Sequence, residues 1–570
     1  MIRPPAGPAA TRSSMERDRF VLDGWSWCLL LSFLLLFVFS LLFVFRVVDD
    51  NTLTSWQWTV GAVGIRRLLL LLSVALVFSL AFFRLRIPEA FPVPVLTLAA
   101  AMAVVPLWRE PELLLDSGRY FLQAKSLSEH GVLFFAREWG HRIMAWTDLP
   151  LVPFLYGLIF SLAGESRTPI QFFNTLVFVL TVLVTFRTGA MLWNRSTGLH
   201  AALLLLGIPY LLTQVPLMLV DIHAMFLLIL ALFCFLTGLR ATGFFPIIVA
   251  AAAVFLAGAV KFSTWPMLVL LPFCGLLYLP EQPARTCRRS AAVFLIVALA
   301  AVPVVVFFYP VLRQQVLLLW TYQRPALRLW HESAPSTFLF QVHPFITMLA
   351  AAGGFLAIRT RDRRFLIPLL PVALIPFLQI QRIRYLLPLF PFIVLLAARG
   401  LEIIREADGR RYAVLLVVSS SMVLAWGAFL PFFNTTSMVN LQRAGRFIDT
   451  LAGDRVEVHA LPQAGSDGNT LIGIAQLDLF TRKKIFSPQG WGPAGEHLPP
   501  LSPLLATWKL RRPAWYGDEA VNAPLVIISG QPLDGNGSLE MGAALPPGRV
   551  RYFTLCSGVF RYRTFVSVYY

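Results

Sequence analysis

Residues 222–239 read IHAMFLLILALFCFLTGL and lie between Asp221 and Arg240. No acid, lysine or arginine interrupts this run. A helix needs about 20 consecutive apolar residues to cross the hydrocarbon core of a bilayer. The run is close to that length, and it predicts a membrane-spanning helix with charged residues at both of its ends.

The rest of the chain repeats this pattern. Hydrophobic residues make up 57% of the 570 residues, and charged residues make up 14%, whereas about 25% is usual in soluble domains. An ordinary soluble protein is therefore excluded. We expect a polytopic α-helical membrane protein with about thirteen transmembrane helices, near residues 25–48, 67–83, 91–107, 169–186, 198–216, 222–239, 243–260, 264–280, 291–309, 343–358, 365–378, 385–398 and 412–433.

The distribution of basic residues predicts the orientation of these spans. The net charge is +18, but the basic residues form short groups between apolar runs, which is typical of membrane topology and not of a nucleic-acid surface. A cytoplasmic N-terminal tail, residues 1–24, places six groups on the cytoplasmic side: Arg84 and Arg86; Arg187 and Arg195; Arg240; Arg285, Arg288 and Arg289; Arg359, Arg361, Arg363 and Arg364; and Arg399, Arg405, Arg410 and Arg411. We expect a multi-pass protein of the inner (plasma) membrane, with no nucleic-acid partner.

Two regions then face the outside: a long loop within the membrane domain of residues 25–433, and the segment that follows this domain. In the first outer loop, residues 109–168, the segment 116–130 has helical periodicity and ends before Gly131. It predicts a helix on the membrane surface, and residues 150–163 predict a second interfacial helix. Residues 434–570 are polar, with an expected helix at 441–452 and expected strands at 456–461, 524–529 and 563–570. They predict a small extracytoplasmic (periplasmic or extracellular) α/β domain.

Two acids at the outer edge are candidate catalytic residues. Asp116 opens the predicted surface helix, and Asp221 is the only acid between Arg167 and Pro280. A charged side chain facing lipid at mid-span costs about 2.5–3.5 kcal/mol, so each acid should face a cavity or cap a helix. Helix capping is the structural alternative to catalysis for both residues.

Cations are predicted at the same edge. Lys261 is the lone charge between two spans, and Arg384 and Tyr385 begin a later span. These cations suit phosphate binding, although Lys261 could snorkel and Arg384 could belong to a solvated turn. The outer histidines lack metal-ligand spacing, and the five cysteines show no CxxC pair. We predict no histidine metal site and no disulfide framework.

The order of these features resembles the GT-C class of polytopic glycosyltransferases. It is similar to the branch of bacterial aminoarabinose transferases and protein O-mannosyltransferases, from about Leu107 to Leu401. The resemblance rests on the pattern D-x-x-x-Y from Asp116 to Tyr120, the apolar helix after Asp148, the acid before a long span, the lysine turn, and RYLLPLFP at 384–391.

This resemblance implies an inverting transfer of a hexose or pentose from a polyprenyl-phosphate donor to a lipid, glycan or protein acceptor on the outer face. Asp116 would act as general base or orient the acceptor hydroxyl, and Asp221 would be the second catalytic acid. Substrate binding would fall to Tyr120, Asp148, Lys261, Arg384 and Tyr385. The resemblance names no cofactor with certainty, and assistance by a divalent metal stays open.

One departure concerns the segment before the second interfacial helix. Aminoarabinose transferases often carry an acid and a lysine before a proline pair there, whereas this chain reads Thr147, Asp148, Leu149, Pro150. The missing lysine leaves the donor sugar and acceptor open.

Two other functions compete with glycosyl transfer. A transporter or flippase of lipid-linked glycans should carry ionisable residues at mid-membrane depth and often a repeated half, and the sequence shows neither. A polysaccharide polymerase or ligase would share the topology and differ in its acceptor; the loop at 310–341, which would bear on this, is of moderate length.

Overall fold

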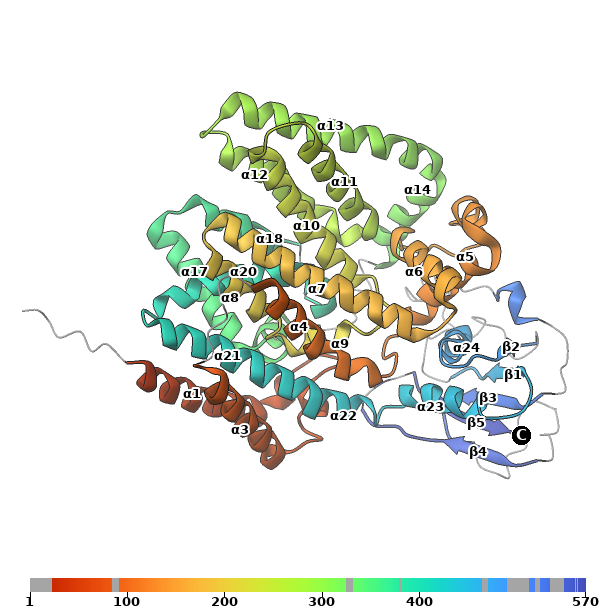
Figure 1. Ribbon diagram of the computed structural model, residues 1–570. Coiled ribbons are helices and arrows are strands. Elements are labelled where there is room, and N and C mark those ends of the chain that lie inside the picture. Colours follow the sequence, from red (N-terminus) through yellow and green to blue (C-terminus); the bar gives the residue numbers. More distant parts are fainter. Residues whose placement is uncertain are drawn as a thin grey trace, which may run out of the picture.

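The structure is a computed structural model that describes residues 23–84, 92–323, 332–378, 381–463, 470–488, 512–517, 523–533, 548–558, 560 and 562–570. The predicted tail, apart from its last two residues, and Arg86 lie outside the described residues. Figure 1 shows a bundle of helices that run roughly side by side, with a small sheet beyond one end of the bundle.

The described residues contain eight helical segments long and apolar enough to cross a membrane. They are α1 (Gly24–Val44), α3 (Ile65–Phe82), α4 with the turn after it (Pro92–Arg109), α7 (Arg167–Leu192), α10 (Asp221–Arg240), α13 (Pro283–Phe307), the segment Ile383–Ile403 that contains α19 (Ile383–Leu386) and α20 (Phe390–Gly400), and the segment Ala407–Phe433 that contains α21 (Ala407–Leu424) and α22 (Leu430–Phe433). The prediction of a mostly helical, multi-pass membrane protein is confirmed.

The exact count of thirteen spans is not confirmed. A further predicted span corresponds to α17 (Pro344–Thr360). The axis of α17 is bent by 116° relative to the preceding segment Ala334–Gln341. If these two segments together form one broken span, the described residues contain nine spans. Four others are short helices: α8 (Arg195–Leu205) with α9 (Pro209–Gln214), α11 (Phe245–Val260), α12 (Leu270–Tyr278) and α18 (Leu366–Phe377). Prolines explain several of the breaks, since Pro209 and Pro266 each start a new helical turn and a proline cannot donate the backbone hydrogen bond.

The packing of the helices separates a core from a lipid-facing layer. Most side chains of α10 and nearly all of α20 are buried, whereas α13 exposes most of its apolar side chains. Helices α17 and α20 touch along Gly353 and Gly400, where a Cβ atom would collide with the backbone of the other helix. Small residues allow such close approach between membrane helices.

The C-terminal region forms a five-stranded mixed sheet in the order β2-β1-β3-β5-β4. The strands are β1 (Arg455–Ala460), β2 (Lys484–Phe486), β3 (Leu525–Ser529), β4 (Val550–Phe553) and β5 (Phe565–Tyr569). The strand β1 is parallel to β2 and β3, and β5 is antiparallel to β3 and β4. Helices α23 (Met438–Ile448) and α24 (Thr470–Asp478) accompany the sheet.

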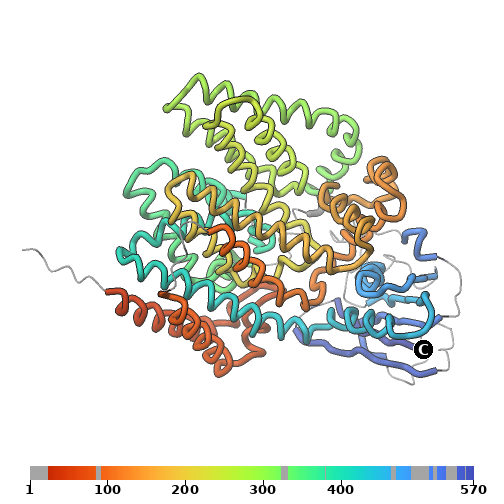
Figure 2. The backbone as a smooth tube through the Cα atoms, in the orientation of Figure 1, coloured from red at the N-terminus to blue at the C-terminus, as the bar shows by residue number. Residues whose placement is uncertain are grey.

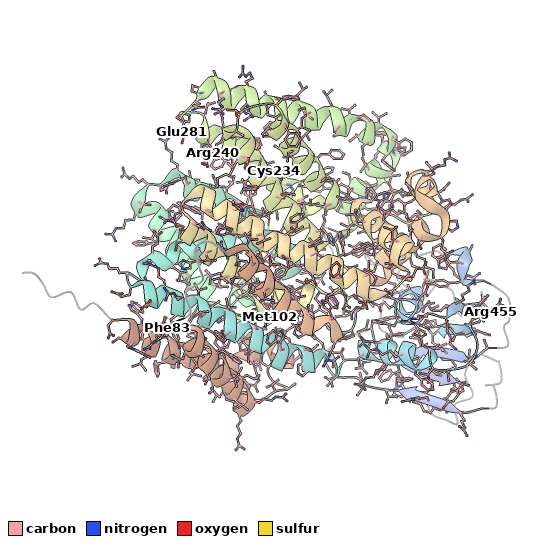
Figure 3. All side chains as sticks on the ribbon, in the orientation of Figure 1. Phe83, Met102, Cys234, Arg240, Glu281 and Arg455 are labelled. Carbon is pink, nitrogen blue, oxygen red and sulfur yellow. The ribbon has the colours of Figure 1, made fainter. Side chains whose placement is uncertain are left out.

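The sheet region and the first predicted outer loop lie at the same end of the bundle. The loop holds α5 (Asp116–Glu138) and α6 (Leu151–Ala163), and Figure 2 shows this orange segment beside the blue C-terminal part. Figure 3 places Arg240 and Glu281 at the opposite end from Arg455, which begins β1. Arg240, which forms one of the predicted inner groups, therefore lies at the end opposite the sheet region.

Helix α24 covers the polar face of the predicted surface helix at 116–130. Residues 117–127 of α5 are all buried. The side-chain amide of Gln476 donates to the carbonyl of Leu114 at 2.9 Å and to the Ser117 hydroxyl at 3.0 Å. The helix does break at Gly131, whose φ is 84°, as predicted.

An ion pair reinforces this contact. Lys125 Nζ lies 2.9 Å from Asp478 Oδ2 and 2.8 Å from Glu165 Oε2. Burial alone would lower the pKa of Lys125, but the charges of Asp478 and Glu165 raise it above its usual value. Lys125 is therefore charged at neutral pH and links α5 to α24.

Replacing Lys125 by methionine should loosen the sheet region from the bundle. The substitution leaves Asp478 buried without its cation, and breaking a buried pair on one side costs about 3–5 kcal/mol. We expect faster proteolysis of the C-terminal region and a lower unfolding temperature. The control Lys484→Met removes an exposed lysine from the same region; an equal effect of both variants would contradict the role of Lys125.

Candidate active site

Asp116 and Asp221 are the first residues of α5 and α10. Neither helix has a side-chain cap, because the capping positions are Leu115 and Val220. The capping alternative is therefore wrong for both acids. Their carboxylates instead point to basic side chains from other segments.

Arg384 joins the two acids. It belongs to α19, and its Nε lies 2.7 Å from Asp221 Oδ2, while its Nη1 bonds Asp116 Oδ2. The Arg384 side chain is 7% exposed, Asp221 is 1% exposed and Asp116 is 20% exposed. Asp116 is thus the acid of the pair that an incoming molecule can reach most directly.

Lys261 completes a chain of alternating charges. It follows α11, and its Nζ lies 2.5 Å from Asp221 Oδ1 and 4.8 Å from the ring centroid of Tyr385. The ammonium lies close enough to the ring for a cation–π contact. Four segments far apart in the sequence therefore meet at Asp116, Arg384, Asp221 and Lys261.

Tyr120 and Asp148 lie on the other side of Asp116. The Tyr120 hydroxyl donates to Asp148 Oδ1 at 3.3 Å. Arg119 bridges the acids, with Nη1 3.3 Å from Asp116 Oδ1 and Nε 2.7 Å from Asp148 Oδ2. The structure thus brings all seven predicted site residues into one connected group.

The charges of this group set the ionisation of Asp116. Burial alone would raise the pKa of the Asp116 carboxyl, but the nearby charges of Arg384 and Arg119 outweigh it and hold the pKa below its usual range. Asp116 is therefore ionised at neutral pH. A carboxylate held in this way is a weak base until its cations are shared with another anion.

Two residues that contribute to the group were not among the predicted site residues. Arg119 lies one helical turn after Asp116, and this spacing was a usable signal. Glu332 accepts a hydrogen bond from the Ile383 amide at 3.3 Å and lies 3.8 Å from Arg382, so it supports the segment that carries Arg384. No sequence signal connects Glu332 to that segment.

A metal site is not apparent in the part of the chain that the structure describes. It contains no cluster of three or more histidine, cysteine, aspartate or glutamate side chains that could hold an ion. The carboxylates of Asp116, Asp148 and Asp221 are each paired with a basic side chain.

Comparison with known proteins adds to this geometry. Residues 148–310 match the family described as dolichyl-phosphate-mannose-protein mannosyltransferase. The crystal structure of ArnT from Cupriavidus metallidurans in the apo state has 14% sequence identity and a TM-score of 0.52, over 83% of this chain and 97% of ArnT. The chain therefore has the fold of ArnT, a polytopic helical fold.

Two further solved structures are similar to this chain. ArnT from the same organism bound to undecaprenyl phosphate has 12% identity and a TM-score of 0.52, over 85% of this chain and 98% of ArnT. The archaeal oligosaccharyltransferase AglB from Archaeoglobus fulgidus, in complex with an inhibitory peptide and a dolichol-phosphate, has 11% identity and a TM-score of 0.43, over 77% of this chain and 69% of AglB. A comparison with curated proteins finds no match.

Proposed function

We propose that the protein is an inverting glycosyltransferase. It would move a hexose or pentose from a polyprenyl-phosphate donor to a lipid, glycan or protein acceptor on the outer face of the plasma membrane. The observation that carries the proposal is the group Asp116–Arg384–Asp221–Lys261 at one end of the bundle. The relatives support the donor class, since ArnT was solved with undecaprenyl phosphate and AglB with a dolichol-phosphate.

The residue types suit displacement of a lipid phosphate. Negative charge builds on the leaving phosphate, and fixed cations at a site of low dielectric stabilise it more than cations in water would. Lys261 and Arg384 would hold the phosphate, with Tyr385 beside the lysine. Asp116 would bind the attacking hydroxyl of the acceptor and accept its proton.

The binding of the donor would also activate Asp116. In the structure Arg384 serves both carboxylates. A phosphate that takes part of the guanidinium would weaken its hold on Asp116 and raise the basicity of that carboxylate. Asp221 is buried and is paired with both Lys261 and Arg384. It would keep these two cations in place.

The position of the charges argues against a transporter. Asp221 begins α10 and Lys261 follows the end of α11, so the group lies at helix ends. Transporters of the inverted-repeat type bind substrate near the membrane midplane.

The transfer itself can be tested on the purified protein in lipid nanodiscs. We would supply undecaprenyl-phosphate-linked hexoses and pentoses with an extract of envelope glycans and lipids, and detect free undecaprenyl phosphate by mass spectrometry. Comparison of lipid-linked sugars and envelope glycans with and without the gene identifies the sugar and the acceptor. Unchanged profiles together with no release from any donor would contradict the proposal.

A reporter fused after Tyr570 tests the orientation. We expect the fusion to read as periplasmic, because the sheet region lies at the same end as Asp116 and opposite Arg240. A reporter fused at the Arg240 loop should read as cytoplasmic. The reverse pattern would place the site on the inner face and would contradict the proposal that transfer takes place on the outer face.

A further inference from the structure

The chain segments that lead into the two acids are irregular. Residues 111–115 precede Asp116, the first residue of α5, and residues 217–220 precede Asp221, the first residue of α10; neither segment is helical. Residues 111–114 and 217–220 are buried. Such a segment has no helix of its own to fix it, and its buried backbone groups need other partners. The positions of the two carboxylates therefore depend on what these segments bond.

Glu112 joins the two segments directly. Its Oε2 accepts a hydrogen bond from the Met218 amide at 3.2 Å. Glu112 precedes Asp116 by four residues, and Met218 precedes Asp221 by three. The Glu112 side chain is 1% exposed, so water does not compete for this contact. One side chain thus bridges the chain just before both acids.

Arg167 holds Glu112 in this position. It is the first residue of α7, and its Nε lies 2.7 Å from Glu112 Oε1. Its Nη1 donates to the carbonyl of Trp108 at 3.3 Å and to the carbonyl of Glu110. Hydrogen bonds that involve ionised groups are about twice as strong as those between neutral groups. The Glu112–Arg167 pair therefore fixes the segment before α5 to the start of α7.

Side chains of α6 and α7 hold the segment at the start of α10. Asn174 Nδ2 of α7 donates to the Leu217 carbonyl at 2.8 Å. The Tyr156 hydroxyl of α6 donates to the Leu219 carbonyl at 2.8 Å. With the Met218 amide, three consecutive residues of this segment each bond a side chain from elsewhere in the chain. The segment cannot shift without breaking buried hydrogen bonds, which are costly to leave unmade.

The spacing of the two acids matters because Arg384 bonds both of them. Its Nε bonds Asp221 and its Nη1 bonds Asp116, and a guanidinium presents its N–H groups in a rigid fork. The fork fits the two carboxylates only when they stand at a fixed spacing. The Glu112–Arg167 pair connects the chain before one acid to the chain before the other, so it can set this spacing.

We propose that the Glu112–Arg167 pair is a positioning pair, which fixes Asp116 relative to Asp221 and thereby the proton-accepting carboxylate relative to the donor phosphate. The effect on transfer rests on the proposed function. The fixed spacing of the two acids does not, so each can be tested separately.

Single-turnover release of undecaprenyl phosphate in nanodiscs tests the effect on transfer. Glu112→Gln keeps the shape of the side chain, but its amide nitrogen would face either the Arg167 guanidinium or the Met218 amide, and both are donors. We expect the rate constant to fall about 10- to 100-fold, because a misplacement of about 1 Å can cost about 10² in rate. The amplitude per folded protein should stay the same. A lower amplitude at an unchanged rate constant would mean that the pair only stabilises the fold, and would overturn the proposal.

The double variant Glu112→Gln/Asp116→Asn shows whether the pair acts through Asp116. Coupled residues reveal themselves in such a cycle by effects that do not add. We expect Glu112→Gln to lower the rate of the Asp116→Asn protein by less than about twofold, because a base that is absent cannot be misplaced. The full 10- to 100-fold loss in both backgrounds would contradict a role through Asp116.

Unfolding temperatures test the fixed spacing without any sugar transfer. Glu112→Gln, Arg384→Ala and the double variant are compared in the same nanodiscs. If the pair and Arg384 maintain one spacing, the double variant should shift the unfolding temperature by less than the sum of the two single shifts. Additive shifts would overturn the fixed spacing. Because no transfer is measured, a failure of the proposed function stays distinct from a failure of the positioning pair.

Glu112→Asp takes the place of Glu112→Gln if the glutamine variant does not fold. It keeps the negative charge and shortens the side chain by one methylene, so it cannot bond both Arg167 and Met218 where they stand. We expect the same fall in the rate constant and the same non-additive shift with Arg384→Ala. An unchanged rate constant and additive shifts would count against the pair.

Glu110→Gln is the matched control. Glu110 is a buried acid of the same loop, and its carboxyl forms no hydrogen bond to a described residue. Burial raises the pKa of Glu110 well above its usual range, so glutamine replaces an uncharged group of nearly the same shape. The rate constant should not change, and the shift with Arg384→Ala should be additive. Equal losses of rate from Glu110→Gln and Glu112→Gln would assign the effect to the loop as a whole and overturn the proposal.

Discussion

Asp116→Asn is expected to lower the rate of sugar transfer by about 10²–10⁴, the usual contribution of a positioned general base. Asparagine has nearly the same shape but cannot accept the proton of the acceptor hydroxyl. Because Arg384 and Arg119 keep Asp116 ionised, the effect should appear throughout the neutral range. Single-turnover release of undecaprenyl phosphate in nanodiscs measures it.

The pH dependence follows from the direction of the same pKa. In the protein without donor, a lowered pKa keeps the carboxylate charged above the usual aspartate value of about 3.9. Asp116 should therefore add no acidic limb to kcat/KM, which reports the free enzyme, between about pH 5 and pH 8. The stability that its ion pairs provide is present above that usual value. It is lost only as the pH falls through the lower folded-state pKa.

Glu129→Gln is the matched control for Asp116→Asn. Glu129 is an exposed acid of the same helix, and its replacement makes the same change of charge. Transfer should be unaffected. If Asp116→Asn retains the unaltered rate in a folded, membrane-inserted protein, Asp116 is not the base.

Arg384→Ala is expected to have the second large effect, a raised apparent KM for the donor. The variant removes the guanidinium that we assign to the lipid phosphate. It also leaves Asp221 buried with Lys261 alone and Asp116 with Arg119 alone. Truncating one partner of a buried ion pair costs about 3–5 kcal/mol, so we also expect a lower unfolding temperature.

Arg384→Lys separates donor binding from folding. Lysine keeps the positive charge. It lacks the planar guanidinium, which can bond two carboxylates and a phosphate at the same time. We expect a folded protein whose donor KM is still raised. Arg405→Ala is the control, because Arg405 is an exposed arginine of a predicted inner group. An unchanged donor KM in folded Arg384→Lys and Arg384→Ala proteins would remove Arg384 from the phosphate site.

Much of the site could be predicted because its residues are unusual where they stand. Asp221 and Lys261 are lone charges at the ends of apolar runs, and the energetic cost of charge in lipid makes such residues conspicuous. Glu332 and Gln476 carry no such signal. Each acts through a hydrogen bond to a backbone group distant in the sequence, Ile383 for one and Leu114 for the other.

The sequence by itself determined the membrane-spanning class, the position of most helices, the break at Gly131 and the three longest strands of the sheet. These depend on local properties, namely the length of apolar runs, the periodicity of side chains and the freedom of glycine at positive φ. Only the tertiary structure decided that Arg384 joins Asp116 to Asp221, and that α24 buries the polar face of α5. Such contacts join residues more than 150 positions apart, and their geometry is set by the packing of whole helices, which local sequence patterns do not encode.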